Sequence, residues 1–548
     1  MKNKKVLAVI PVRGGSKGIP RKNLRLMGGQ PLFLYSVENA GKCPYITDFV
    51  ITTDDEEIIG IAQMYGIEYI ERDASLAADD VPLDPVIYDA VIKTEKKHGY
   101  TYDIVVTLQA TSPLLSQETL TNALADFFHN DFDTCISTQN RPHLAWQVKD
   151  GKFVPAYTAR VNRQQLPAYY TETGAFLISN RTNVTAKTRI GEKITIYEVP
   201  EKEAVDIDSI NDWQLCEDII NRKRIMFRCD GEKKLGMGHI YRCMTLAYSL
   251  TGHEIIFILD SRKKEGIKKI QESFFPYHLI DTEDDFYHFA DTWNADIIIN
   301  DCLDTDVDYM QALRRYTKKI VNFEDLGFGA ELADVVINAL YDSQKNQLPY
   351  YFSGEKYICL RDEFQLSIPK QFSPTVKNIL VMFGGTDPCN LTQRIYELAR
   401  KNENKYSDIQ YTFILGSGYE NNNKIVSDGR IKVLTDVKRI SDHMKAADLA
   451  ITSQGRTVYE LAVLGIPAIV LAQNQREQLH TFAQMKNGFI NLGLGSSVSD
   501  STIEFTLEWM IKTPQVRQEM QTLMLSHDLK SGLKRVIRLI LDENINDI

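Results

Sequence analysis

The sequence predicts an α/β protein built from mostly parallel sheets. Short apolar runs alternate with amphipathic segments along the chain, a pattern typical of parallel strands joined by helical crossovers. The strand pattern begins afresh near residues 222–224 and again after the proline-containing link at 368–374. Because 548 residues are too many for one core, we predict three domains, over residues 1–222, 224–372 and 373–548.

The first domain opens on an apolar run and continues with regular alternation. We expect strands at residues 6–12, 49–53 and 104–109, and helices at 32–40, 58–65 and 117–129. The loops after these strands should converge on one pocket, because ligands bind at the carboxyl ends of parallel strands. Residues 141–177 are less regular and richer in Tyr, Gln and Asn, so we interpret them as an inserted lid or a dimerisation arm.

The second half of the chain shows the alternation twice more. In its first part we expect strands at residues 225–228, 254–259, 296–300, 319–323 and 335–337, with a helix at 240–250. In its second part we expect strands at 376–383, 411–415, 430–434, 449–452 and 468–471. This half should therefore hold two further α/β domains.

The composition excludes several classes of function. A net charge of −10 argues against a general nucleic-acid binder. No apolar run is long enough to cross a bilayer and the start of the chain lacks a signal-peptide pattern, so we expect no membrane partner and a cytoplasmic location. The eight cysteines show no C-x-x-C pair, which suits free thiols in a reducing compartment.

The loop after the first strand concentrates cations among glycines. It reads Arg13-Gly-Gly-Ser-Lys-Gly-Ile-Pro-Arg-Lys-Asn23. Glycine lets backbone N–H groups approach a ligand closely, and the cations supply charge for a polyphosphate. A basic turn without a ligand is the alternative, but the charge concentrated beside a buried strand favours a phosphate site.

Three more motifs follow this loop in the first domain. They are Leu108-Gln-Ala-Thr-Ser-Pro-Leu114, then Arg163-Gln-Gln-Leu-Pro167 with Glu172-Thr-Gly-Ala175, and Glu203-Ala-Val-Asp-Ile-Asp208. In order and content, the four motifs resemble the CMP-sialic, pseudaminic and legionaminic acid synthetases, which transfer CMP from CTP to a nine-carbon acidic sugar. The resemblance implies a Rossmann-like nucleotidyltransferase domain. Because enzymes of this family tend to be dimers, it also implies a homodimer formed through this domain.

The resemblance assigns roles to individual residues. Those implied to bind CTP are Arg13, Gly14, Gly15, Lys17, Asn23 and Arg72. Lys22 would act closest to the reacting phosphate, and Gln109 and Arg163 would hold the acidic sugar, since a guanidinium suits a carboxylate. Asp206 and Asp208 would be catalytic ligands of Mg²⁺, because alternation places both carboxylates on one face of an extended segment.

Three glycine-bearing turns in the second half each follow an expected strand. They are Gly236-Met-Gly-His-Ile-Tyr-Arg242, Gly384-Gly-Thr-Asp-Pro388 and Ser453-Gln-Gly-Arg-Thr-Val-Tyr-Glu460. Backbone N–H groups at a helix N-terminus bind phosphates. Together with Leu360-Arg-Asp-Glu-Phe364 and Gln473-Asn-Gln475, these turns resemble the pseudaminic-pathway hydrolases of UDP-2,4-diacetamido-2,4,6-trideoxy-β-L-altropyranose, which have a two-Rossmann, glycosyltransferase-B-like fold.

This second resemblance also implies residue roles. His239 would activate or orient water at the anomeric carbon, because its pKa lies near working pH, and Asn474 would be a second catalytic residue. Those implied to bind UDP are Gly238, Gly384, Gly385, Gly455, Thr457 and Glu460. Arg456 stands where a small residue is more usual, and would narrow the pocket or add a phosphate contact. The resemblance implies no cofactor for this half.

For the whole chain we favour a bifunctional enzyme of nonulosonic acid synthesis, with CTP, a nine-carbon acidic sugar and a UDP-sugar as its ligands. The hydrolase resemblance favours pseudaminic acid, whereas Gly18 together with Pro20 and Arg21 blends features of the pseudaminic and of the legionaminic or sialic acid enzymes. The alternatives make the second half a glycosyltransferase or a degenerate nucleotide-sugar-binding module.

Overall fold

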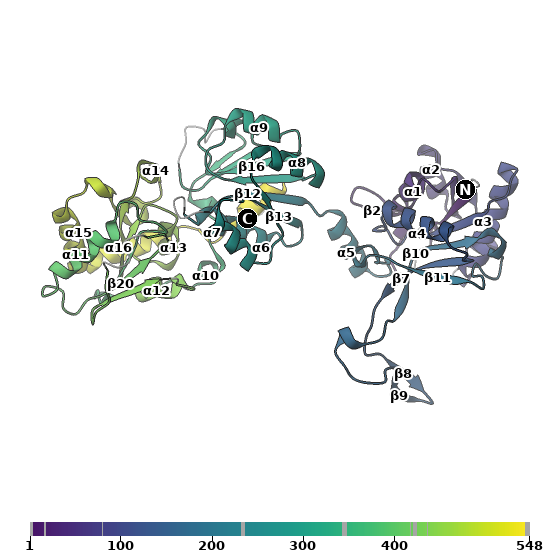
Figure 1. Ribbon diagram of the computed structural model, residues 1–548, viewed down its shortest axis with the longest axis horizontal. Coiled ribbons are helices and arrows are strands. Elements are labelled where there is room, and N and C mark those ends of the chain that lie inside the picture. Colours follow the sequence, from purple (N-terminus) through teal and green to yellow (C-terminus); the bar gives the residue numbers. More distant parts are fainter. Residues whose placement is uncertain are drawn as a thin grey trace. The chain divides into compact units, whose positions relative to one another are not determined.

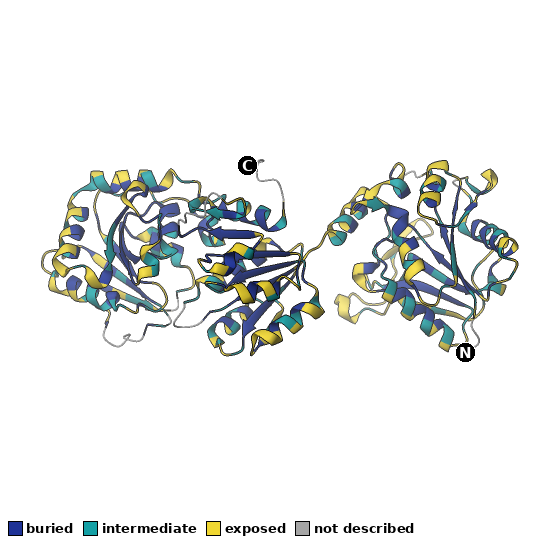
Figure 2. Cartoon of the chain, turned by 90° about the horizontal axis from the view of Figure 1, so that it is seen from above, coloured by how far each residue is buried: buried dark blue, intermediate teal, exposed yellow. Residues whose placement is uncertain are grey.

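The computed structural model contains three large β-sheets (Figure 1). It describes residues 4–15, 18–78, 80–231, 236–341, 348–416, 418–419, 425–435 and 437–542. The chain divides into two compact units, Met1–Arg222 and Lys223–Ile548. The strands of the sheets are largely buried, and the helices expose their outer faces (Figure 2). Within the described ranges, none of the helices has the length and apolar character needed to span a membrane.

The first unit is built on a seven-stranded sheet. Its strands, in spatial order, are β11 (Ile194–Glu198), β7 (Thr134–Asn140), β10 (Tyr170–Asn180), β6 (Ile104–Leu108), β1 (Val6–Pro11), β4 (Asp48–Thr53) and β5 (Tyr69–Glu71). β1 runs parallel to β4 and β6, whereas β10 runs antiparallel to β6 and β7. Strand order reverses between β1 and β6, so the loops after these two strands open at the ligand-binding position of a doubly wound sheet.

The helices of this unit are α1 (Leu32–Lys42), α2 (Glu56–Met64), α3 (Leu83–His98), α4 (Gln117–His129) and α5 (Ile210–Ile220). The expected strands and helices of the first domain are confirmed to within a few residues, and the structure adds the helices α3 and α5 and the sheet strands β5, β7, β10 and β11 to them. All but the last residue of β1 are buried, which explains why its continuous apolar run is such a clear strand signal.

Part of the irregular stretch at 141–177 forms an arm. Two short antiparallel strands, β8 (Trp146–Lys149) and β9 (Lys152–Pro155), lie at its tip, away from the sheet to which β7 and β10 belong (Figure 1). The apolar side chains of Trp146 and Phe153 are 56% and 78% exposed. A further short pair, β2 (Leu26–Met27) and β3 (Gln30–Pro31), lies near the basic loop.

The second unit contains two parallel sheets, each the centre of a Rossmann-like lobe. The first lobe carries β14 (Tyr277–Ile280), β13 (Glu254–Asp260), β12 (Arg224–Cys229), β15 (Ile297–Asp301), β16 (Lys319–Phe323), β17 (Val335–Asn338) and β18 (Tyr351–Ser353), in spatial order. The second lobe carries β21 (Ile431–Thr435), β20 (Gln410–Leu415), β19 (Asn378–Met382), β22 (Leu449–Ser453), β23 (Ala468–Ala472) and β24 (Phe489–Leu494), in spatial order. The strands expected in the second half are confirmed.

The helices of the first lobe are α6 (Gly238–Ser249), α7 (Lys264–Glu272), α8 (Glu283–Trp293) and α9 (Val307–Leu313). Those that follow are α10 (Asp362–Gln365), α11 (Leu391–Lys401), α12 (Ile440–Ala446), α13 (Thr457–Leu464), α14 (Gln475–Gln478), α15 (Asp500–Lys512), α16 (Pro514–Leu525) and α17 (Gly532–Leu541). α17 returns to the first lobe, where Val536, Leu539 and Ile540 join the core around β12. Strand order reverses between β12 and β15 in one lobe and between β19 and β22 in the other, which predicts a ligand at both places.

Candidate functional sites

The loops after β1 and β6 converge on a cavity of about 200 Å³ in the first unit. It is lined by Pro11, Arg13, Lys22, Asn23, Arg72, Leu83, Gln109, Ala110 and Thr111. Five of the residues expected to hold CTP, the reacting phosphate or the acidic sugar therefore share one hollow. Gly14 and Gly15 lie in the loop itself, and Lys17 lies outside the described residues.

Glycines allow this loop to pack against its neighbours. A Cβ on Gly14 would lie 2.2 Å from the Asp55 carboxylate, and a Cβ on Gly18 would lie 2.6 Å from the carbonyl oxygen of Asp208. Any larger residue at position 18 would therefore push the basic loop away from the segment that carries the two expected metal ligands.

Lys22 connects the loop to that segment. Its ammonium donates a hydrogen bond to the carbonyl oxygen of Ile207, the residue between Asp206 and Asp208. Burial lowers the pKa of Lys22, and the two carboxylates oppose this shift. Burial also raises the pKa of Asp206. A cation and two carboxylates thus meet beside the cavity.

The Asp206 carboxylate fits a bound cation. Its Oδ1 is buried without a hydrogen-bond partner, and an unsatisfied buried carboxylate oxygen is costly unless a ligand pairs with it. Asp208 is exposed. Within the described residues, no group of three or more His, Cys, Asp or Glu side chains forms a metal cluster.

Two cavity residues present polar atoms that lack partners. Asn23 donates to the carbonyl oxygen of Arg13 at 2.9 Å, but its Oδ1 is buried and unpaired. Arg72 is 7% exposed and donates to the carbonyl oxygen of Thr52 at 2.8 Å, while its Nε is unpaired. Such atoms are candidates for hydrogen bonds to a polar ligand such as a nucleotide base.

The two residues expected to hold the acidic sugar lie in different surroundings. Gln109 lines the cavity, and a Cβ on Gly174 would lie 3.3 Å from its Nε2 and 3.2 Å from Asp206 Oδ2. Gly174 has a φ of +73°, so this close approach suits glycine alone. Arg163 is exposed on the arm, in a short 3₁₀ helix (Arg163–Gln165), and does not line the cavity.

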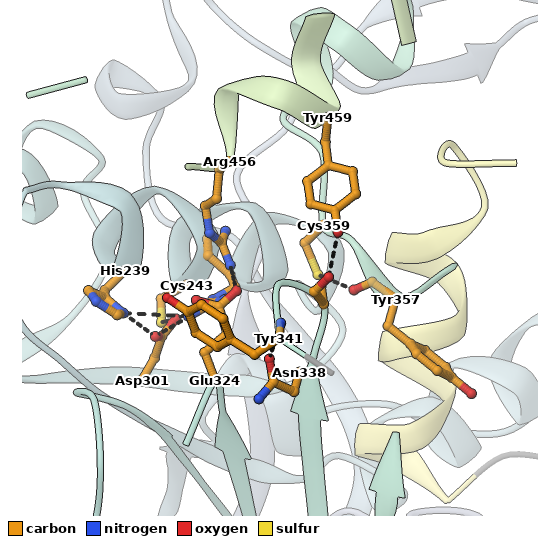
Figure 3. A network of polar contacts seen from close by, with 12 residues as sticks. His239, Cys243, Asp301, Glu324, Asn338, Tyr341, Tyr357, Cys359, Arg456 and Tyr459 are labelled. Atoms are coloured by element: carbon orange, nitrogen blue, oxygen red, sulfur yellow. Dashed lines mark hydrogen bonds and ion pairs between the residues drawn. The ribbon is translucent and has the colours of Figure 1, made fainter. Parts of the chain in front are cut away.

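In the second unit, His239 lies next to the point where strand order reverses in the first lobe. It stands in the first turn of α6, and its Nδ1 is 2.5 Å from Oδ1 of Asp301, the last residue of β15 (Figure 3). Burial alone would raise the pKa of Asp301, but Arg242 and His239 hold it well below its usual range. Because the carboxylate is ionised, it accepts the hydrogen bond that Nδ1–H of the imidazole donates.

Arg242 fixes Asp301 from the other side. Its Nε and one terminal nitrogen contact the two carboxylate oxygens at 2.5 Å each, and its side chain is 2% exposed. Its other terminal nitrogen pairs with Glu324, which in turn pairs with Arg456 at 2.8 Å. The imidazole thus rests on a buried, charge-balanced network.

A cavity of about 340 Å³ lies beside this network, between the two lobes. Gly238, Gly384, Gly385, Thr457 and Glu460 are the expected UDP-binding residues that line it. Gly384 has a φ of +73°, which explains the glycine directly after β19.

Other expected residues are placed differently. Gly455 lies in the loop before α13 but is not part of the cavity wall. Glu460 is engaged by Arg361, whose terminal nitrogen lies 2.8 Å away. Asn474 is exposed and caps α14, accepting a hydrogen bond from the backbone N–H of Glu477 at 2.9 Å. Asn474 does not line the cavity either.

Comparison with known proteins decides the family of the first unit. The family model for cytidylyltransferases matches residues 7–233. The pseudaminic acid cytidylyltransferase of Campylobacter jejuni is 31% identical over 230 residues, which cover 40% of this chain and 95% of that protein. This chain belongs to the cytidylyltransferase family.

Two other relatives and a second family model extend the comparison. The CMP-N,N'-diacetyllegionaminic acid synthase of C. jejuni is 28% identical over 227 residues, covering 40% of this chain and 97% of that protein. An uncharacterised protein of Methanocaldococcus jannaschii is 31% identical over 278 residues. The match covers 46% of this chain and 57% of the length of that relative. The model for the glycosyltransferase family 28 C-terminal domain matches residues 379–535, in the second unit.

Two residues of the second site of this cytidylyltransferase, Asp301 and Glu324, were not expected from the sequence. Asp301 ends an apolar strand, and Glu324 directly follows the next one, β16. Each has the same signal as Gly384, a polar or small residue at the carboxyl end of a buried parallel strand. Doubly wound sheets bind ligands at the carboxyl ends of their strands, so this position in the sequence could have identified both residues.

Proposed function

We propose that the chain is a bifunctional, cytoplasmic enzyme of nonulosonic acid synthesis. The first unit would transfer CMP from CTP to a nine-carbon acidic sugar with release of pyrophosphate. The second would hydrolyse a UDP-diacetamido-trideoxyhexose to UDP and the free sugar. The observation that best supports the first activity is the convergence of Arg13, Lys22, Asn23, Arg72 and Gln109 on one cavity of a cytidylyltransferase.

The first reaction requires cations that stabilise the negative charge formed on the leaving pyrophosphate. The anomeric hydroxyl of the sugar attacks the α-phosphorus of CTP, and negative charge grows on the departing pyrophosphate. Arg13 and Lys22 line the cavity and would bind that charge, and Asn23 and Arg72, whose buried polar atoms lack partners, would bind cytidine. Mg²⁺ held by Asp206 and the nearby Asp208 would neutralise phosphate charge.

The acidic sugar would bind Gln109, and Arg163 would join it from the arm of a second copy. A homodimer formed through this unit supplies a reason for the exposed Trp146 and Phe153, which a monomer leaves in water. We favour pseudaminic acid because of the second unit, since the relatives that act in pseudaminic and legionaminic acid synthesis resemble the first unit to a similar degree.

The second reaction uses His239. Its Nδ1–H is held by Asp301, so Nε2 is the nitrogen available to accept a proton from water as the water attacks the anomeric carbon. The bond from that carbon to the diphosphate oxygen breaks, and UDP leaves. Gly238, Gly384, Gly385 and Thr457 would bind UDP in the neighbouring cavity.

A product assay on the purified full-length chain tests both halves. With CTP, Mg²⁺ and pseudaminic acid we expect pyrophosphate and the CMP-sugar; legionaminic acid should give less. With the UDP-sugar alone we expect UDP and the free hexose in equal amounts. Failure to release UDP from any diacetamido-trideoxyhexose substrate would remove the hydrolase from the proposal and leave the cytidylyltransferase.

A glycosyltransferase is the second candidate for the second unit, because its family model there describes a glycosyltransferase domain. The two candidates differ in what the sugar is transferred to. Addition of sugar acceptors should leave the yield of free hexose unchanged for a hydrolase, whereas a transferase would form a glycoside at the expense of the free sugar.

A further inference from the structure

Arg456 joins the two lobes at the edge of the cavity in the second unit. It stands directly before α13 of the second lobe, lines the cavity, and reaches Glu324 of the first lobe with a nitrogen–oxygen distance of 2.8 Å (Figure 3). Its Cδ lies 3.8 Å from the position that a Cβ on Gly238 would take. The side chain therefore lies among the glycine-bearing turns that would bind a nucleotide.

Glu324 is a costly residue to keep at this position. Its side chain is 7% exposed, and burial raises its pKa. Its φ is +53°, a left-handed conformation that disfavours residues with a Cβ. Its Oε1 accepts from both Arg242 and Arg456. This one oxygen thus connects Arg456 to the arginine that fixes Asp301.

Arg456 has hydrogen-bonding capacity left over. A guanidinium carries five N–H donors, and within the described residues the contacts of Arg456 account for one of them, to Glu324. The four nearby charges of Arg242, Arg456, Asp301 and Glu324 sum to zero, so a diphosphate beside Arg456 would meet a preorganised donor without a net negative charge behind it.

We propose that Arg456 binds the diphosphate of the nucleotide, and that Glu324 is a positioning residue that holds Arg456 and ties it through Arg242 to Asp301 and His239. This inference rests on the proposed action on a UDP-sugar and adds a specificity contact to it. Arg456 selects a nucleoside diphosphate over a nucleoside, and the connected network aligns His239 with the bond that breaks.

The chain offers a matched control in Arg476. This arginine also crosses between the lobes, contacting both carboxylate oxygens of Asp304 at 2.8 Å and the carbonyl oxygen of Glu324 at 2.9 Å. It does not line the cavity. R476Q therefore removes a link between the lobes without removing a cation from the proposed ligand site.

Calorimetric titration of the full-length chain with UDP and with uridine tests the contact. In the unmodified chain UDP should bind more tightly than uridine. R456Q should reduce that preference by about ten- to a hundredfold, the range expected for loss of charge-assisted hydrogen bonds. R456K should keep part of it, and R476Q, which leaves Arg456 and its pair with Glu324 in place, should reduce it much less than R456Q does. E324Q should lower kcat for UDP release more than it raises KM.

The outcomes separate this inference from the function beneath it. If the unmodified chain neither binds UDP nor releases it, the proposed hydrolase fails. If it binds UDP and R456Q keeps the full preference over uridine, the hydrolase stands and Arg456 has no phosphate contact. An unchanged kcat in E324Q would overturn the positioning role. Should R456Q fail to fold, the smaller loss expected of R456K decides the matter by the same ratio.

Discussion

Replacement of Asp301 by asparagine tests the second site at its most buried charge. Asp301 is 0% exposed and accepts from His239 and twice from Arg242. D301N keeps the shape but presents an amide N–H₂ to one of these donors. In either orientation of the amide, the imidazole loses the negative charge that stabilises its Nδ1–H tautomer and the imidazolium formed when Nε2 takes a proton.

The size of the effect follows from the contacts. Removal of one partner from a buried ion pair costs about 3–5 kcal/mol. Because Arg242 keeps Glu324 as a partner, we expect the lower end, about 3 kcal/mol of the free energy of unfolding of the second unit. A histidine in the wrong tautomer loses most of its action as a base, so kcat for UDP release should fall by about a thousandfold.

Stopped assays of UDP release and denaturant unfolding of the full-length chain measure the two effects. Pyrophosphate release by the first unit is the internal control and should stay within about twofold, because the two sites belong to separate compact units and share no residues. UDP release at the unmodified rate in D301N would refute the role given to the His239–Asp301 pair.

Three further predictions concern other residues. Burial holds the pKa of Asp206 above its usual range, so its ionised form destabilises the first unit at neutral pH. D206N should therefore raise the midpoint of thermal unfolding while lowering pyrophosphate release about a hundredfold or more. A fall in both the midpoint and the release would contradict this account of Asp206. Burial lowers the pKa of His480 to about 4, so between about pH 6.5 and 4 the unfolded chain binds more protons than the folded chain. The free energy of unfolding should therefore fall by up to about 3 kcal/mol on acidification from pH 6.5 to 4. In urea titrations, H480Q should show a weaker dependence of this free energy on pH. Asn474 caps α14, so N474A should lower the free energy of unfolding by about 1 kcal/mol, whereas N474D should keep both stability and UDP release. Loss of UDP release in N474D with stability intact would instead show that the Asn474 amide takes part in catalysis.

The sequence could predict where the two candidate sites lie, but it could not predict most of the contacts made within them. Arg13, Gln109 and Gly384 each stand at the end of a clear apolar strand, and His239 lies at the start of the helix that follows one; the rules of parallel sheets bring such positions together. Glu324 and its shared oxygen depend on how one lobe meets the other, which no local pattern encodes.

Other features lay beyond the sequence for the same reason. The return of α17 to the first lobe depends on long-range packing of Val536 and its neighbours. Arg163 belongs to a motif that is easily recognised in the sequence, but in the structure its side chain is exposed on the arm, away from the cavity lining. Motif spacing predicts local turns, whereas the reach of an arm or a returning helix is decided by tertiary contacts.

The central claim is that one chain carries two independent activities, and reciprocal variants test it most directly. Lys22→Ala and His239→Ala are assayed side by side for pyrophosphate release and UDP release. We expect K22A to lose the first and keep the second, and H239A to keep the first and lose the second. If both variants lose the same activity, or if H239A still releases UDP at the unmodified rate, the division of labour proposed for the two units is wrong.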